Sequence, residues 1–245
     1  MKLKKLFKSK KQKKQTPIPR LDIVKDEIDG LDIETRKVLN LLNYTKTSGV
    51  AYDGGLYDVG YHSFDFNNKK FKGQRDPKQR FEKVDIDFTG KTVLDIGCNQ
   101  GGMLFAIADK IGHGVGIDFD SRMINTANRI KRYKSQDNLD FYVFDLAKEN
   151  LEIINDFLVK KVDVCLLLSI CMWIPNWKAV VDFCFAVSDK MIFESNGKQE
   201  KQEEQKAYLE TKYAQVTLLS NTSDDDAKQK KRKLYLCHKD KKTIE

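Results

Sequence analysis

Apolar and polar positions alternate along this chain in two rhythms, one typical of strands and one typical of helices. Short aliphatic runs that read as strands occur near residues 92–96, 114–118, 139–144, 162–169 and 189–194. Segments that repeat apolar residues at helical spacing follow them, near residues 102–111, 120–133, 148–160, 176–187 and 199–213. Because strands that alternate with helices pair in parallel, we predict an α/β fold with helices on both faces of a parallel sheet.

The end of the chain breaks this rhythm. Residues 214–219 and 233–238 both read as strands, and the polar segment 221–232 between them leaves little room for a crossover helix. Strands joined by such a short connection pair antiparallel, so we expect a terminal hairpin.

The first ninety residues read differently from the rest. We divide the chain into a basic tail (1–20), an N-terminal extension (21–90) and a core (91–245). In the extension we expect a loop and four short elements: a helix over 34–44, a glycine-rich loop over 49–60, a hairpin of residues 61–66 and 69–72 around Asn67-Asn68, and a helix over 77–84 that Asp76 caps and Pro77 begins.

The formal charge of +8 is unevenly spread. Residues 1–20 carry +9, which leaves −1 for the remainder of the chain. A near-neutral body argues against a dedicated nucleic-acid-binding protein, and a basic tail indicates nucleic acid less firmly than a basic body does. We interpret the tail as solvated and disordered. Two alternatives stay open, a weak anchor to anionic lipid and an arm on RNA phosphate.

The five cysteines form no C-x-x-C pair and no Cys/His cluster at metal spacing. We therefore expect a reducing compartment, no disulfides and no metal site. No apolar segment is long enough to span a membrane, and the charged N-terminus lacks the apolar region of a signal peptide. A cytoplasmic location is expected, with the tail as the feature that could bring the chain to a membrane surface.

The stretch from Val93 to Gly102 combines a strand, a tight loop and a helix start. Gly97 and Gly101 allow positive φ and close approach of a ligand. Asp118 follows about twenty residues later, at the end of the next apolar run, where ribose hydroxyls would need an acceptor. A nucleotide-like ligand beside a parallel sheet is therefore expected. The G-x-G-x-x-G pattern is missing, which disfavours a nicotinamide-dependent enzyme.

Residues 91–238 resemble the class I S-adenosylmethionine (SAM) methyltransferases, which have a Rossmann-like sheet of five parallel strands and a terminal antiparallel pair. The first motif of that family is acid-x-Gly-x-Gly-x-Gly. Here Asn99 stands for the middle glycine, and asparagine tolerates left-handed backbone next best. The resemblance implies SAM as cofactor, S-adenosylhomocysteine (SAH) as product, an extension that covers the site, and cofactor contacts from Asp95, Gly97, Cys98, Asn99 and Gly101.

Three further motifs resemble the same family. The second implies that Asp118 accepts the ribose hydroxyls, with Phe119 beside it. The third implies that Asp145 accepts the adenine amino group and that the backbone NH of Leu146 reaches the ring. The fourth places Ser169 beside the transferred methyl group. As an alternative, Asp145 caps the helix that follows it.

Closer resemblance is to the RNA γ-phosphate methyl-capping (bicoid-interacting) enzymes and to bacterial O-antigen chain-terminating methyltransferases. It rests on residues 73–77, 94–99, 116–124 and 168–174. By this resemblance Arg75 would hold the SAM carboxylate, which suits a bidentate guanidinium. A surface ion pair of Arg75 with Asp76 or Glu82 is the alternative.

Candidates for chemistry lie near the predicted site. A hydroxyl acceptor wants a base, for which His62 is the better candidate and Tyr61 its neighbour. Trp173 stacks on the acceptor or lines the methyl pocket, and burial at the sheet edge is the alternative. Glu194 ends the fifth strand and should face the same cleft, as a substrate-binding candidate.

We predict a SAM-dependent O-methyltransferase that acts on a sugar, sugar phosphate or glycan end in surface polysaccharide synthesis. The alternatives are an RNA methyltransferase, acting on a 5′-end phosphate or a base, and a SAM-binding module without catalysis. No Asn/Asp-Pro-Pro-Tyr follows the fourth strand and no proline precedes Cys171, which disfavours amino-group and cytosine-C5 methylation. The oligomeric state stays open.

Overall fold

The computed structural model describes residues 31–45, 59–66, 68–223, 225–226 and 230–240. The basic tail and most of the predicted loop at 49–60 lie outside these residues. The predictions made for them are therefore not tested by the structure.

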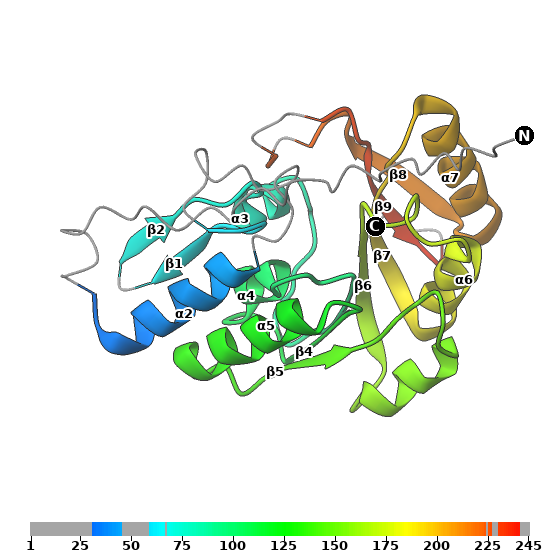
Figure 1. The fold of residues 1–245 in the computed structure, drawn as a ribbon. Helices are drawn as coiled ribbons and strands as arrows, with labels where there is room; N and C mark the ends of the chain where they lie inside the picture. Colours follow the sequence, from blue (N-terminus) through cyan, green and yellow to red (C-terminus); the bar gives the residue numbers. More distant parts are fainter. Residues whose placement is uncertain (1–30, 46–58, 67, 224, 227–229, 241–245) are drawn as a thin grey trace, which may run out of the picture.

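The core is a sheet of seven strands in the order β5-β4-β3-β6-β7-β9-β8 (Figure 1). The strands are β3 (Thr92–Ile96), β4 (His113–Asp118), β5 (Leu139–Val143), β6 (Val162–Leu168), β7 (Ser188–Glu194), β8 (Gln215–Ser220) and β9 (Leu234–His238). The first five are parallel, which confirms the predicted α/β fold. Because β3 lies between β4 and β6, the strand order reverses at β3, and a crevice forms at the carboxyl ends of the strands at such a point.

The terminal hairpin is confirmed, and the structure adds the order in which its two strands join the sheet. β9 pairs antiparallel with both β7 and β8, so the later strand lies between the two earlier ones. The fully buried strand is therefore β9, whereas β8 forms the edge and is partly exposed.

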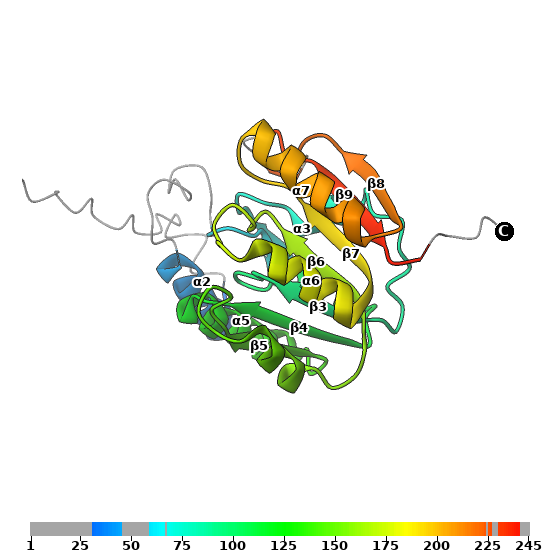
Figure 2. The same ribbon diagram turned by 90° about the vertical axis from the view of Figure 1, so that its right-hand side faces the viewer.

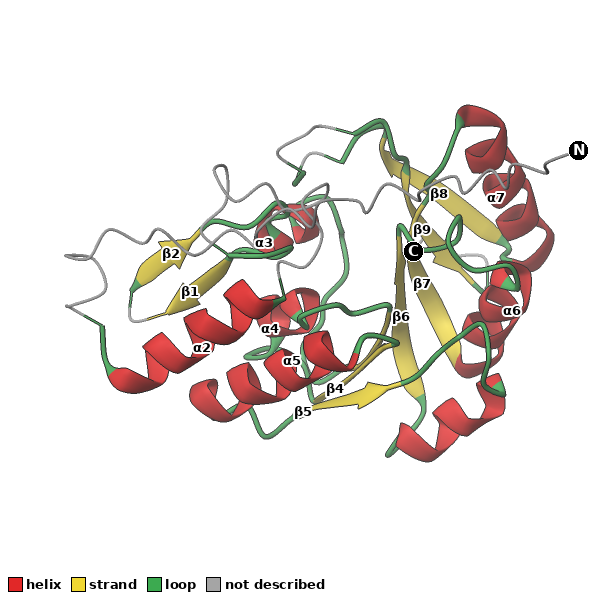
Figure 3. Cartoon of the chain, in the orientation of Figure 1, coloured by secondary structure: helices red, strands yellow, loops and turns green. Residues whose placement is uncertain are grey.

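Helices cover both faces of the sheet (Figures 2 and 3). They are α2 (Ile33–Tyr44), α3 (Pro77–Phe81), α4 (Gly102–Ile107), α5 (Ser121–Lys134), α6 (Trp177–Val187) and α7 (Gln199–Lys212). Apolar residues of α6 and α7 pack on the face that carries Leu94 and Ile96. Those of α4 and α5 pack on the opposite face, which carries Val93, because alternate residues of a strand point to opposite sides.

One predicted helix is wrong. Residues 148–160 were expected to form an α-helix, but the structure has a 3₁₀ helix, η1 (Leu151–Phe157). Asn150 caps its start by accepting from the backbone NH of Glu152, and Leu158 is already extended. The helical segment is therefore limited to seven residues between these two positions. Two other helices are shorter than predicted: α3 ends at Phe81 and α4 at Ile107.

The described part of the extension packs on the core. The hairpin is confirmed as β1 (Phe64–Phe66) and β2 (Lys69–Phe71), with Asn68 at φ 60° in its turn. Val38, Leu42 and Phe66 form an apolar cluster with Ile130 of α5. The division of the chain into tail, extension and core stays a prediction.

All five cysteines are buried and free. Within the described residues, no helix has the length and hydrophobicity that a bilayer-spanning segment needs.

Candidate functional site

The loop after β3 takes a left-handed backbone at three positions. Gly97, Asn99 and Gly101 have φ values of 77°, 52° and 76°. Asparagine therefore does adopt the conformation expected of the missing glycine. At Gly101 a Cβ atom would lie 2.6 Å from the ring of Phe141, so this position also needs glycine for space.

Asp118 ties this loop to the end of β4. Its two carboxylate oxygens accept from the backbone NH groups of Asn99 and Asp120, both at 2.9 Å. Burial raises the pKa of Asp118, and these hydrogen bonds oppose the shift. The carboxylate thus holds two strand ends together and keeps further lone pairs for a ligand.

Asp95 is a buried carboxyl group with an unsatisfied oxygen. Its side chain is 2 % exposed, and its Oδ2 has no hydrogen-bond partner among the described residues. Burial, and to a lesser extent the nearby Asp118, raise the pKa of Asp95 to about 8. The group is therefore mostly protonated at pH 7 and can donate a hydrogen bond as well as accept one.

This proton links Asp95 to stability. An unfolded aspartate has a pKa of about 3.9, so the folded chain holds the extra proton between about pH 4 and pH 8. The stabilisation that Asp95 contributes is complete below that range and is lost as the pH rises through 8. In Asp95→Asn the thermal midpoint should therefore fall less than that of the wild type between about pH 5 and pH 9. Calorimetric scans across that range test it, and parallel declines would show that Asp95 ionises normally.

The predicted adenine contacts at the end of β5 have partners of their own. The Asp145 carboxylate accepts from the backbone NH of Ala147 at 3.0 Å and pairs with Lys148 at 2.7 Å. These contacts close a turn at 146–148, whereas the next helix is η1, which Asn150 caps, so the alternative in which Asp145 caps that helix is wrong. The adenine role stays a prediction. Leu146 is buried, whereas the ring of Phe119 is 72 % exposed at the end of β4.

The turn after β6 presents one exposed ring. Trp173 is 71 % exposed, so its burial at the sheet edge, offered as an alternative, is wrong. Ser169 has φ 61°, which is uncommon for a residue with a side chain. Its Oγ is buried without a partner among the described residues. This turn therefore brings one unsatisfied hydroxyl and one free aromatic face to the carboxyl edge of the sheet.

His62 and Tyr61 are both drawn into the interior. The backbone NH of His62 donates to Gln100 at 3.2 Å, and its ring lies against the backbone of Gly102 at the start of α4. Burial, followed by the Arg75 charge, lowers the pKa of His62 to about 3. Burial raises the pKa of Tyr61. Neither group is a base poised near neutral pH, and their catalytic roles stay predictions.

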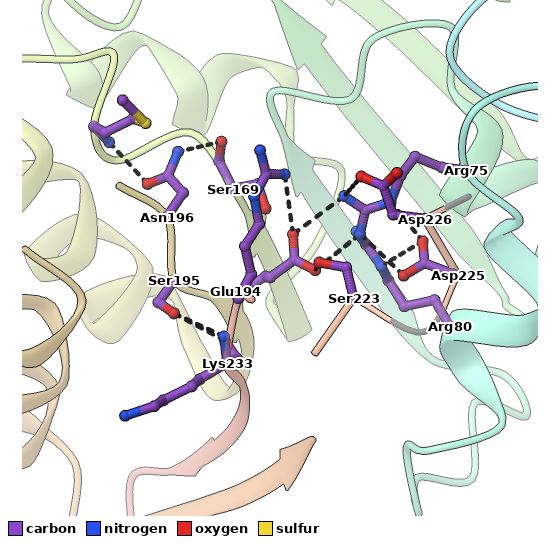
Figure 4. Close-up of polar contacts among 12 residues, drawn as sticks. Arg75, Arg80, Ser169, Glu194, Ser195, Asn196, Ser223, Asp225, Asp226 and Lys233 are labelled. Atoms are coloured by element: carbon purple, nitrogen blue, oxygen red, sulfur yellow. Dashed lines mark hydrogen bonds and ion pairs between the residues drawn. The ribbon is translucent and has the colours of Figure 1, made fainter. Parts of the chain in front are cut away.

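Arg75 is the largest fully buried side chain among the described residues. The surface ion pair with Asp76 or Glu82 is therefore wrong. Its Nε donates to Asp225 at 2.7 Å, and its Nη2 donates to Glu194 at 2.8 Å and to Asp225 at 3.0 Å (Figure 4). The contacts of Nη1 with the Tyr61 hydroxyl and with Glu194 are longer, at 3.4 Å each. A role for Arg75 on the SAM carboxylate stays a prediction.

Glu194 is the hub of this cluster. It accepts from Arg75, from Arg80 at 3.0 Å and from the hydroxyl of Ser223 at 2.9 Å, and it is 1 % exposed. These three bonds all end on Oε1, whereas Oε2 has only the 3.4 Å contact with Arg75 Nη1 and lies 3.8 Å from Arg232. Glu194 thus faces a buried ion cluster, and its predicted position in the ligand cleft stays a prediction. A contact of Glu194 with substrate stays a prediction.

Several residues of the site have no signal in the sequence. They form hydrogen bonds through polar side chains: Arg80, Gln100, Gln205, Ser223, Asp225 and Asp226. Asp225 and Asp226 lie in the polar connection between β8 and β9, where no motif marks them. Gln100 alone lies within a predicted motif, at a position that the motif leaves open.

The comparisons with known proteins agree with one another on a methyltransferase family. Residues 87–237 match a family model described as a methyltransferase domain. A protein of Invertebrate iridescent virus 6 named as methyltransferase 235L is 34 % identical over 93 residues, which is 37 % of this chain and 31 % of that protein. The human 7SK snRNA methylphosphate capping enzyme is 37 % identical over 78 residues, which is 29 % of this chain and 11 % of the enzyme. The chain thus matches less than a third of the length of either.

Solved structures show the same fold. The N-terminal domain of EvdMO1 with SAH bound has a TM-score of 0.62 at 11 % identity, over 86 % of this chain and 98 % of that one. The bifunctional kinase-methyltransferase WbdD has a TM-score of 0.55 at 21 % identity, over 71 % of this chain and 42 % of that one.

Proposed function

The chain belongs to the methyltransferase domain family, and on this premise we propose that it transfers a methyl group from SAM to an oxygen atom of a sugar, sugar phosphate or glycan end. The observation that carries the proposal is the buried carboxyl of Asp95. Its free oxygen lies beside a left-handed loop, at the point where the strand order reverses. Such a crevice is where open α/β sheets bind nucleotide-like ligands.

The residues present fit SAM. The cofactor carries an ammonium, a carboxylate, ribose hydroxyls and an adenine ring. Against these groups the strand ends offer the unsatisfied oxygens of Asp95 and Ser169, the spare lone pairs of Asp118 and the exposed ring of Phe119. We assign cofactor binding to these residues and to the loop at 97–101.

The cofactor supplies a methyl group on a sulfonium, which an acceptor oxygen takes by in-line displacement. The main task of the protein is then to hold the acceptor in line. Trp173 offers its free face for this task. Because His62 has a pKa of about 3 and the pKa of Tyr61 is raised, neither suits the activation of a sugar hydroxyl near pH 7. A phosphate oxygen is already anionic and needs no base, which favours a phosphorylated acceptor.

A second candidate acceptor is the 5′-end phosphate of an RNA. The identity of 37 % with the human 7SK snRNA methylphosphate capping enzyme favours it. The charge of −1 outside the basic tail favours the sugar phosphate or glycan, because RNA binding draws on positive surface charge.

Labelled transfer into a cell extract separates these candidates. The full chain is incubated with tritium-methyl SAM and the extract, which is then divided into RNA, glycolipid with polysaccharide, protein and small molecules. Label in the glycan or small-molecule fraction that resists ribonuclease supports the proposal, whereas label that ribonuclease removes supports the RNA end. Label in no fraction, with SAM binding intact, identifies a binding module. The Asp118→Ala variant provides the background.

We also propose that the tail binds an anionic surface. Deleting residues 1–15 should leave SAM affinity unchanged, because every predicted cofactor contact lies at Arg75 or beyond it along the chain. Binding to vesicles with anionic lipid, or to RNA, should weaken, and more so at low salt, because Lys–phosphate attraction is screened by ions. Sedimentation with vesicles and a gel shift with RNA measure the two cases. Equal binding by the full and shortened chains to both would exclude a role for the tail.

A further inference from the structure

The turn at residues 169–173 follows β6 and borders the crevice. Its first residue, Ser169, has a left-handed backbone, a conformation that is strained for a residue with a side chain. Surrounding contacts must therefore hold it. The backbone NH of Ser169 donates to the carbonyl of Glu194 at 2.9 Å, and the NH of Trp173 donates to the carbonyl of Ile170 at 2.8 Å.

One side chain from the next strand holds both ends of this turn. Asn196 follows β7 and is fully buried. Its Nδ2 donates to the carbonyl oxygen of Ser169 (Figure 4). Its Oδ1 accepts from the backbone NH of Met172 at 2.9 Å. The Asn196 amide thus satisfies one acceptor and one donor of the turn, three residues apart.

A second amide fixes the first. Gln205 of α7 is 2 % exposed, and its Oε1 accepts from the backbone NH of Asn196 at 3.0 Å. Its Nε2 donates to the backbone carbonyl of Asn196 at 3.1 Å. Burial of polar amides is unfavourable unless they are hydrogen-bonded, and here these bonds set the position of Asn196. The turn is thereby connected to α7.

We propose that Asn196 is a positioning residue for methyl transfer, which holds the turn at 169–173 so that Ser169 and Trp173 border the acceptor. The proposal rests on the function proposed above and names a residue through which that site is built. The position requires an amide. An aspartate can accept from Met172 but cannot donate to Ser169, whereas a leucine of similar size can do neither.

The test uses Asn196→Asp and Asn196→Leu, with Gln202→Leu as the matched control. Gln202 lies one helical turn before Gln205 and is also buried, but it bonds to Ser195, Gly197 and Lys231. The Gln202→Leu variant therefore loses buried amide hydrogen bonds of the same kind, but none of these bonds reaches the turn at 169–173. All variants also carry Trp177→Phe, which leaves Trp173 as the one tryptophan of the chain.

Three quantities are measured. In both Asn196 variants the anisotropy of Trp173 should fall below that of Gln202→Leu and that of the chain with Trp177→Phe alone. SAH affinity, from calorimetry, should fall by a smaller factor than methyl transfer, because Ser169 moves with the turn whereas the loop after β3 and Asp118 are untouched. Methyl transfer into the fraction that the wild type labels should fall at least about tenfold in Asn196→Leu. In Asn196→Asp it should stay below half of the wild-type transfer.

Either of two results would overturn the proposal. One is anisotropy and transfer in Asn196→Leu equal to those of the chain with Trp177→Phe alone, and the other is an equal loss of transfer in Gln202→Leu, which would indicate general packing between β7 and α7. The failure of the proposed function is distinguishable. If the proposed function fails, the wild type labels no fraction although it binds SAH. The role of Asn196 in methyl transfer is then overturned together with the proposed function. The anisotropy still shows whether Asn196 holds the turn at 169–173.

Discussion

Arg75→Met is expected to lower the free energy of unfolding by about 3–5 kcal/mol, the cost of leaving buried charges without their partner. Three carboxylates share the guanidinium: Glu194 and Asp225 by hydrogen bonds, and Asp226 at 3.7 Å. Each is at most 3 % exposed in its side chain. Without Arg75, two cations are left for the three buried acids: Arg80, which contacts Glu194 and Asp225, and Arg232, which lies 3.8 Å from Glu194.

Urea unfolding measures this loss, and two further variants show its cause. Lys161→Met breaks an ion pair with Asp189 at the surface, where water screens the charges, and should leave the urea midpoint close to that of the wild type. The double variant Arg75→Met/Asp225→Asn removes a charge of each sign and should recover part of the stability. A midpoint for Arg75→Met as high as that for Lys161→Met would show that the cluster is not a source of stability.

Asp118→Ala is expected to weaken SAM binding by more than about tenfold, a loss of about 1.4 kcal/mol. The substitution removes the predicted acceptor for the ribose hydroxyls. It also leaves the backbone NH of Asn99 without its partner, so the left-handed loop after β3 loses an anchor. Both effects act on the same site and should appear together in titration calorimetry.

Asp140→Ala is the matched control. Asp140 lies on the neighbouring strand β5, but near its amino end, where it pairs with Lys131 and His113. Because nucleotide-like ligands bind at the carboxyl ends of such strands, SAM affinity should be unchanged in this variant. Equal affinities for the Asp118→Ala variant and the wild type would remove Asp118 from the site.

Local features of the site could be predicted from the sequence because they depend on neighbours in the chain. The loop at Gly97–Gly101 lies between a strand and a helix that have strong periodicity of their own, and the left-handed Asn99 follows from the conformational tolerance of asparagine. The seven strands follow from short apolar runs in the same way. By contrast, the 3₁₀ helix at Leu151–Phe157 has caps closer together than its apolar pattern indicates.

Contacts across the chain could not be predicted in this way. Arg75 meets Glu194 and Asp225 at separations of 119 and 150 residues, and only the folded sheet brings these segments together. A buried arginine and an exposed one have the same local sequence signal. The same holds for Asn196, because its role depends on the turn after another strand.

The place of β9 has a consequence for the order in which the chain folds during synthesis. β8 leaves the ribosome before β9, yet β9 is its one neighbour in the described sheet. The edge of β7 therefore stays unpaired until β9 has been made. The parallel half of the sheet can form while β8 is still unpaired. Strand edges of this kind are the sites at which nascent chains aggregate. Strand β9, although it is made after β8, therefore pairs with the edge of β7 and protects the strands made before it.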